Sequence, residues 1–423
     1  MSESTYNDPC TAKVFKPPVG GFLDIELTLN WFAGVAFVCG LASARMVNLV
    51  GEIFVGELLI VQFAFLLLML GRVRQALSLP AFGLFLQMAV VMLLGYMLAD
   101  IYRDALAAQF LRGWARVILV TLDFVALVIV CAHDKRNLWW FVFGMALGAL
   151  GQLVIRGVPI SSPAGWKFGY SAPLVTLLTC MSCIMPMRFS ALGFVALGVC
   201  NIVMDFRILG AICVAIGAIL WIRSADADRF TGARILQLFG IGMLAACILG
   251  GTIMATQGEF AKRREQSNAG RSVSLSVAAW AIAESPLIGY GSWPTDTRLV
   301  NLYNHAMEQS GQFSPNEASV GSFSAHSQIL QVWVEGGLLG VLFWIYYGFW
   351  LIRTILYVVL RRPADAFMPV FLFILIYDLW HLFMSAFSGP TRLPIALGVA
   401  VICVCAAELR EARGLQCATL ARR

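Results

Sequence analysis

The chain has 423 residues, of which 60% are hydrophobic and only 13% are charged, and its mean hydropathy is +0.80. This composition lies far outside the range of soluble globular domains. The composition therefore excludes a water-soluble enzyme and predicts a polytopic membrane protein. The formal net charge of +6 at pH 7 is small for a chain of this length.

Apolar runs along the chain predict about twelve transmembrane helices, because a spanning helix needs about 20 apolar residues and satisfies its own backbone hydrogen bonds. The stretch before Phe22 is polar and lacks a cleavable signal pattern, so we expect the first span to remain in the membrane. We expect the spans near residues 26–44, 50–70, 80–99, 113–132, 137–155, 170–185, 188–203, 206–222, 234–255, 335–360, 366–385 and 391–408.

These spans divide the chain into three parts. Residues 1–255 hold the first nine spans, residues 256–325 form one long hydrophilic outer loop, and residues 326–423 hold the last three spans and a basic tail. Within the loop, Asn268 is a candidate cap for a helix over about 270–283, which the turn residues Ser285-Pro286 would end. The polar composition from 293 to 323 predicts a flexible lid.

The distribution of Lys and Arg predicts that both termini face the cytoplasm, because basic residues favour cytoplasmic loops. This orientation leaves a group of basic residues in the short outer loops: Arg45, Arg103, Arg112, Arg116, Arg156, Lys167, Arg207 and Arg392. Taken one at a time, these side chains would extend to the phosphate groups of the lipids. As a group they predict a cationic outer cavity for a phosphate or pyrophosphate, since guanidinium groups donate paired hydrogen bonds to oxyanions.

Among the histidines, His326 stands where the outer loop ends and an apolar helix begins. An unperturbed imidazole pKa of about 6.5 would let it accept a proton near neutral pH, and the alternative is a helix cap. Glu335 either orients this histidine or caps the helix. Asp378 and His381, one turn apart in a predicted span, form either a functional pair or a packing hydrogen bond.

The eleven cysteines indicate no disulfide framework, because most lie in predicted spans and the long outer loop has none. No outer cluster of His, Asp and Glu has the spacing of metal ligands. We therefore expect a protein without a metal or another cofactor.

The segment from His326 to Gly340 resembles the motif of the O-antigen ligase and polymerase superfamily, which is His, then Asn, Ser or Gln, nine residues and Gly-x-x-Gly. Upstream, Arg271 to Leu275 is similar to the Arg-x-x-x-Leu motif of that family's outer loop. Arg207 stands at the place of the family's outer arginine, with Phe206 and Ile208 in place of the usual small neighbours. The stretch Trp166 to Tyr170 resembles a basic-x-x-Gly segment, with Lys167 as the basic residue.

The resemblance implies an all-α GT-C-type glycosyltransferase that acts at the periplasmic face of the bacterial inner membrane. Its donor would be a glycan on undecaprenyl pyrophosphate, and its acceptor a sugar hydroxyl of lipid A-core. By the same resemblance His326 would be the general base. The donor pyrophosphate would be bound, without a metal and without nucleic acid, by Arg207, Arg271, Lys167 and Arg103.

Three alternatives stay open. A polymerase of the same superfamily would share the fold and the motif but use a lipid-linked glycan as acceptor. A transporter is suggested by the number of spans, although the two halves show no repeat. A cytoplasmic nucleotide-sugar enzyme would use the acidic triplet Asp226-Ala227-Asp228, which otherwise belongs to a solvated loop.

Overall fold

The computed structural model describes residues 31–48, 52–71, 76–224, 258–310, 323–360 and 365–420, and it is mostly helical. Within these residues six helical segments are long and apolar enough to cross a membrane: α4 (Phe82–Tyr102), α5 (Ala107–His133), α6 (Lys135–Ile155), α10 (Arg207–Ser224), α14 (Gln328–Leu360), and η2 (Gly389–Thr391) continued by α16 (Arg392–Leu420). Four shorter apolar helices accompany them: α1 (Trp31–Ala42), α2 (Val55–Met69), α9 (Met187–Val203) and α15 (Met368–Met384). The protein is therefore an all-α membrane protein.

Helices occupy every predicted span except 234–255, which lies outside the described residues, as does the acidic triplet 226–228. The span predicted at 170–185 holds the short helix α8 (Ser171–Met181). At the start of the span predicted over 50–70, the structure has a small antiparallel hairpin instead, in which β1 (Met46–Asn48) pairs with β2 (Glu52–Phe54). The count of twelve spans stays a prediction.

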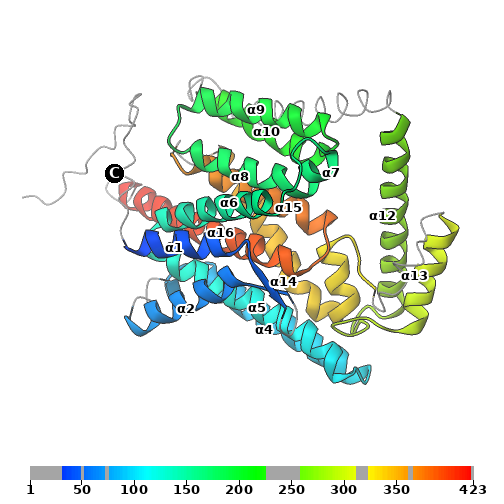
Figure 1. Ribbon diagram of the computed structural model, residues 1–423. Helices are drawn as coiled ribbons and strands as arrows, with labels where there is room; N and C mark the ends of the chain where they lie inside the picture. The colour runs from blue at the N-terminus through cyan, green and yellow to red at the C-terminus, as the bar shows by residue number, and fades with distance from the viewer. Residues whose placement is uncertain are drawn as a thin grey trace, which may run out of the picture.

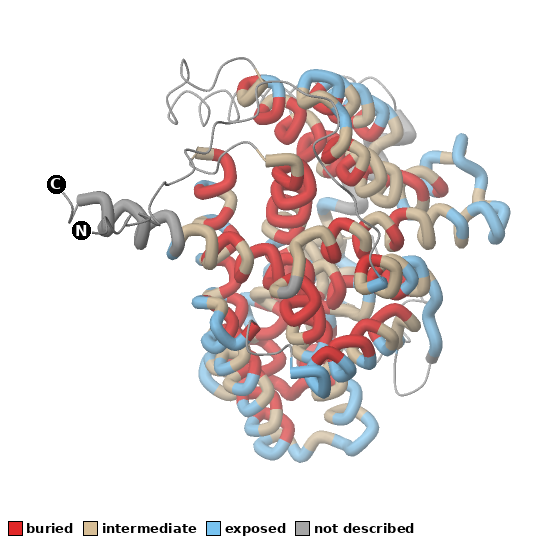
Figure 2. The backbone as a smooth tube through the Cα atoms, turned by 90° about the vertical axis from the view of Figure 1, so that its left-hand side faces the viewer, coloured by how far each residue is buried: buried red, intermediate tan, exposed pale blue. Residues whose placement is uncertain are grey.

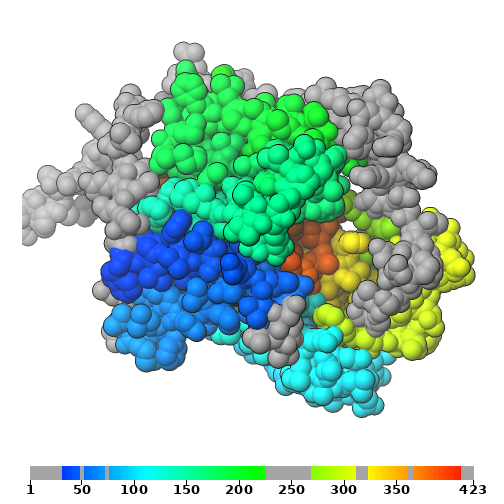
Figure 3. Space-filling model, in the orientation of Figure 1, coloured from blue at the N-terminus to red at the C-terminus, as the bar shows by residue number. Residues whose placement is uncertain are grey.

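The helices lie side by side in a bundle, with α12 (Gly258–Glu284) and α13 (Thr297–Gln309) at one end of it (Figure 1). We call this the loop end; α16 finishes at the opposite end. Among the closest pairs are α9 with α10, α1 with α6, α4 with α14 and α5 with α16. Figure 2 shows the buried residues running through the middle of the bundle, and Figure 3 shows α9 and α10 on one side of the molecule and the N-terminal helices on the other.

Helix α12 is longer than the sequence predicts. It begins at Gly258 and runs through Asn268, so the prediction that Asn268 caps it is wrong. The ten residues before Asn268 are mostly good helix formers, including Glu, Ala, Lys, Arg and Gln, which is why the helix starts earlier. Its end at Glu284, just before Ser285-Pro286, agrees with the prediction.

The stretch predicted as a flexible lid contains the helix α13. The Asp296 carboxylate caps it by accepting hydrogen bonds from the backbone N–H groups of Arg298 at 2.9 Å and Leu299 at 3.2 Å. Leu299 is fully buried in a cluster with Val277 of α12. The helix was not predicted because the sequence does not show that Leu299, Leu302 and Tyr303 pack against a cluster on α12. The prediction of a lid stays a prediction. Residues 311–322 lie outside the described part.

Helix α14 is broken at Gly337, whose φ of 62° and ψ of −152° are not helical. The break frees backbone groups, and the loop segment 287–291 binds them. The carbonyl groups of Val334 and Glu335 accept hydrogen bonds from Tyr290 N–H (2.7 Å) and Gly291 N–H (3.0 Å), and Leu338 N–H donates to Leu287 (3.1 Å). The outer loop is thereby joined to α14 directly after the segment that carries His326.

We predict that Gly337→Ala destabilises the protein. Its backbone conformation is open essentially only to glycine and costs other residues about 1–3 kcal/mol, and a Cβ there would lie 2.2 Å from the carbonyl oxygen of Leu287. Thermal unfolding of the detergent-solubilised variant would measure the effect. Gly151→Ala is the control, because nothing lies within 4 Å of a Cβ at that position of α6; equal melting temperatures for both variants would contradict the prediction.

Candidate functional site

His326 lies at a bend in the short segment that leads into α14. Its side chain is exposed, while those of Ala325 and Ser327 are buried. Ser327 caps the helix, because its Oγ accepts a hydrogen bond from Leu330 N–H at 3.4 Å. The sequence left open whether His326 caps α14, and the structure assigns this cap to Ser327. Within the described residues, the imidazole of His326 makes no side-chain hydrogen bond.

Helix α12 holds this segment in place through Ser274. The Ser274 Oγ accepts a hydrogen bond from the backbone N–H of His326 at 3.0 Å and donates one to the Ser324 carbonyl at 3.4 Å. Arg271 precedes Ser274 by three residues and therefore lies on the same face of α12. Desolvation by the surrounding protein, and then the positive charge of Arg271, lower the pKa of His326 below its ordinary 6.5. The structure thus brings His326 and Arg271 together and favours the neutral imidazole.

Lys167 and Arg207 form a second cationic group. Lys167 belongs to a short π-helix, η1 (Trp166–Tyr170), which follows α7 (Pro163–Gly165) at the loop end of the bundle (Figure 1). Both cations approach the Asp205 carboxylate, Lys167 at 3.6 Å and Arg207 at 3.3 Å. Among the described residues, neither cation makes an ion pair or hydrogen bond with the group around His326.

Arg103, the fourth predicted donor ligand, is engaged with the outer loop. Its Nε donates to the Gly289 carbonyl at 3.0 Å and its Nη2 to Ser285 Oγ at 3.1 Å. The guanidinium also lies over the ring of Tyr290, 4.5 Å from its centre. Arg103 therefore holds the turn that pairs with the broken part of α14.

Behind His326, a buried polar network surrounds Glu335. Its carboxylate forms an ion pair with Arg116 at 2.6 Å and accepts hydrogen bonds from Tyr96 and from Gln331 (2.9 Å). Arg116 also donates to the carbonyl of Phe387 at 2.7 Å. Close contact of α4 with α14 makes this possible, since a Cβ on Gly95 would lie 2.8 Å from the backbone nitrogen of Gly340.

Glu335 thus neither orients His326 nor caps the helix, the two roles that the sequence left open for it. A second buried pair lies nearby, where Arg392 contacts Glu57 through two hydrogen bonds of 2.9 and 2.7 Å. Sequence reasoning grouped Arg116 and Arg392 with the outer cations but missed their partners, because each pair joins residues more than 200 positions apart. The sequence signal for these partners was the presence of an acidic residue, Glu335 or Glu57, in an otherwise apolar helix.

A comparison with protein-family models finds a match for the part of the chain that includes His326. Residues 176–345 match the model described as O-antigen ligase. These residues form an O-antigen ligase family domain. The matched range includes Arg207, Arg271 and His326, whereas Lys167 and Arg103 precede it. No curated protein matches the chain.

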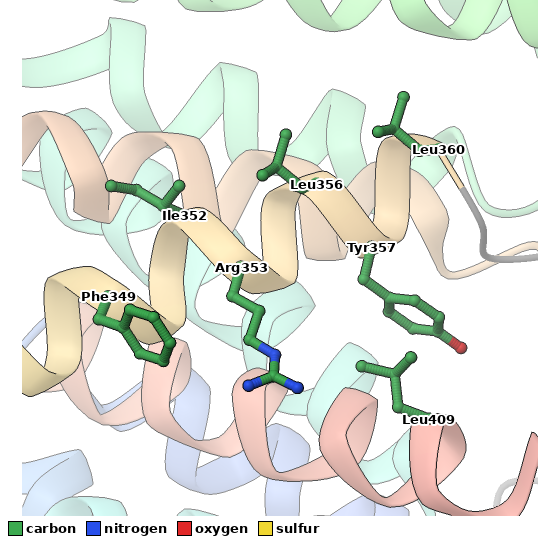
Figure 4. A pocket seen from close by; sticks show the side chains of 7 residues that line it. All are labelled: Phe349, Ile352, Arg353, Leu356, Tyr357, Leu360 and Leu409. Carbon is green, nitrogen blue, oxygen red and sulfur yellow. The ribbon is translucent and has the colours of Figure 1, made fainter. Parts of the chain in front are cut away.

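The O-antigen ligase domain contributes to a cavity of about 780 Å³ at the loop end, which is lined in part by Ser324, Gln331 and Glu335. Figure 4 shows another cavity, of about 460 Å³, between the later parts of α14 and α16. Its wall is apolar apart from Arg353 and the Tyr357 hydroxyl, with Phe349 and Leu409 among the lining residues. The first cavity therefore adjoins the segment from His326 to Gly340, which contributes Gln331 and Glu335 to its wall.

Asp378 and His381, beyond the O-antigen ligase domain, do not pair with each other. The Asp378 carboxylate accepts a hydrogen bond from the Tyr347 hydroxyl at 2.7 Å, deep in the bundle. The His381 Nδ1 is 2.6 Å from Ser385 Oγ, one turn further along α15. Of the two alternatives from the sequence, these contacts favour helix packing.

We predict that Glu335→Gln strongly destabilises the protein, because Arg116 would remain buried without a counter-charge. Breaking a buried pair costs about 3–5 kcal/mol. Asp205→Asn is the matched control: its pairs with Lys167 and Arg207 involve cations that are one-third exposed, so we expect a loss below about 1 kcal/mol. Thermal unfolding in detergent would measure both, and similar shifts would contradict the assignment of Glu335 to a structural network.

Proposed function

We propose that this protein is an O-antigen ligase that transfers a glycan from undecaprenyl pyrophosphate to a sugar hydroxyl of lipid A-core. The observation that carries the proposal is the exposed imidazole of His326 beside Arg271, on a segment fixed by Ser274, within the residues that match the O-antigen ligase model. In this proposal the chain is a GT-C-type enzyme of about twelve spans in the bacterial inner membrane. Both termini face the cytoplasm, and the loop end faces the periplasm.

The proposed reaction is a direct displacement at the anomeric carbon with inversion. The acceptor oxygen forms a bond to that carbon while the bond to the pyrophosphate oxygen breaks, and the hydroxyl proton passes to His326. A positioned base contributes roughly 10²–10⁴-fold to such a step. The lowered pKa of His326 supports this role, because the ring is then neutral and able to accept the proton.

The pyrophosphate leaves with additional negative charge, and cations placed where that charge develops lower the barrier. We assign this role to Arg271, Arg207 and Lys167, and no metal is required. Arg207 and Lys167 share a single carboxylate, that of Asp205, so together they retain one excess positive charge for the donor. Arg103 acts indirectly in this proposal, by holding the turn at 285–290.

The first test is His326→Ala, which we expect to reduce transfer by about 10²-fold or more while the protein still inserts and folds. Transfer would be followed on gels after reconstitution with a lipid-linked glycan and purified rough lipopolysaccharide. His305→Ala is the control, because His305 lies on α13 and its ring contacts only Gln309 among the described residues. Transfer by the His326 variant at the wild-type rate would remove the proposed base.

The second test concerns pH. Since the pKa of His326 is lowered, we expect kcat/KM to fall only at a pH below 6.5, where the ring becomes protonated. Arg271→Gln removes one of the two causes of this shift, so the acidic limb should move to higher pH. Arg207→Gln should lower kcat/KM without moving the limb. A limb that stays in place in Arg271→Gln would contradict the coupling between these two residues.

Deletion of the gene would separate a ligase from a polymerase of the same superfamily. Without a ligase, polymerised glycan remains on the carrier lipid. Without a polymerase, single units appear on the lipid A-core. Substrate movement across vesicles without glycosyl transfer would instead indicate a transporter.

A further inference from the structure

The cavity of about 780 Å³ at the loop end is built from segments that are far apart in the sequence. Its wall combines the first turns of α5, strand β2, the outer loop at Trp293 and Ser324, α14 before its break, and the turn from Phe387 to Arg392. The volume is typical of a small-molecule site. None of the four predicted donor ligands is among the described residues that line it, so the cavity is distinct from the proposed pyrophosphate site.

The cavity comes within two residues of the proposed base along the chain. Ser324 lines the cavity, and His326 follows it after the buried Ala325. Both Ser324 and His326 are exposed. A molecule held in the cavity therefore lies close in the chain to the segment that carries the imidazole, although His326 itself is not one of the lining residues.

The charged groups of the wall differ in how they are paired. Arg116 and Arg392 are buried, and each forms an ion pair with a buried glutamate. Arg112 lies one helical turn before Arg116 on α5 and is exposed, and among the described residues it makes no ion pair or hydrogen bond. The Nε of Arg116 is also buried without a hydrogen-bond partner. Among the described residues of the wall, the guanidinium of Arg112 is therefore the one that is exposed and unpaired, and it is available to an anionic ligand.

The remaining lining residues fit a sugar. The Trp293 ring is a flat apolar surface, with the guanidinium groups of Arg112 and Arg116 each 5.9 Å from its centre. Sugar rings present C–H groups on their faces and hydroxyl groups at their edges, so an aromatic ring bordered by polar groups suits both. The Glu52 carboxylate and the Ser324 hydroxyl supply such groups at the wall.

We propose that this cavity binds the acceptor, a sugar carrying a phosphate or carboxylate group, with Trp293 against the ring and Arg112 on the anionic group. The inference rests on the proposed function, because the proposed base lies two residues after Ser324 of the cavity wall and would have the acceptor hydroxyl as its partner. An exposed guanidinium binds either anion through paired, charge-assisted hydrogen bonds. The source of the charge therefore has to be separated by experiment.

The test is binding of core oligosaccharide from rough lipopolysaccharide to the full-length protein in detergent, without donor so that no transfer occurs. Three probes are compared: the intact oligosaccharide, the same material after phosphatase, and the same material with its carboxyl groups reduced. We expect one of the two treatments to weaken binding to the wild type by about tenfold or more, and that treatment identifies the anion.

Arg112→Gln should bind the intact oligosaccharide as weakly as the wild type binds the probe that has lost the recognised anion. The variant should no longer distinguish the intact probe from that treated probe. Trp293→Leu should weaken binding of all three probes by a similar factor. Arg298→Gln is the control with wild-type behaviour, because Arg298 is an exposed arginine of α13 whose partner is Glu284. The proposal is overturned if neither treatment matters, or if Arg112→Gln discriminates as the wild type does.

Failure of this inference can be told apart from failure of the proposed function. Glycan transfer in which the KM for the acceptor does not change in Arg112→Gln would overturn the cavity assignment and leave the ligase activity standing. Arg112-dependent binding of the oligosaccharide by a protein that transfers no glycan would support the cavity and remove the ligase.

Discussion

The break in α14 at Gly337 is the constraint on which the rest of the site depends. A continuous helix would use the carbonyl groups of Val334 and Glu335 internally, and the loop segment 287–291 would have nothing to bind. With the break, the loop segment 287–291 is attached to the bundle by backbone hydrogen bonds, which do not depend on side-chain identity. Two residues before the break, the side chain of Glu335 contacts Arg116 and Tyr96, so the same short stretch of α14 holds the loop through its backbone and the buried network through a side chain.

Most of the bundle could be predicted from the sequence, because a membrane-spanning backbone must satisfy its hydrogen bonds within a helix. The length of each apolar run then indicates the length of the spanning helix. The loop could be predicted less well. Its helices depend on contacts that a polar composition does not reveal, such as Leu299 packing against α12 and the early start of that helix at Gly258.

For the site, His326 and Arg271 could be found from local patterns, since the residues of each motif are close in sequence. Their proximity to each other depends on Ser274, a small polar residue that no pattern singled out. The pairing of Arg116 with Glu335 joins two distant helices, so a single sequence contains no record of it. Exposed and buried arginines look alike in the sequence. Only the structure separates Arg112, which is exposed and has no ion-pair partner in the described part of the chain, from Arg116, which is buried and has a counter-charge.

The bond between Ser274 and the backbone of His326 has a mechanical consequence. Because this hydroxyl also contacts Ser324, it holds the chain on both sides of Ala325, and the arginine one turn earlier moves with it as part of the same rigid rod. A displacement of α12 at Ser274 would therefore be passed to the backbone that carries the imidazole through a single hydroxyl group.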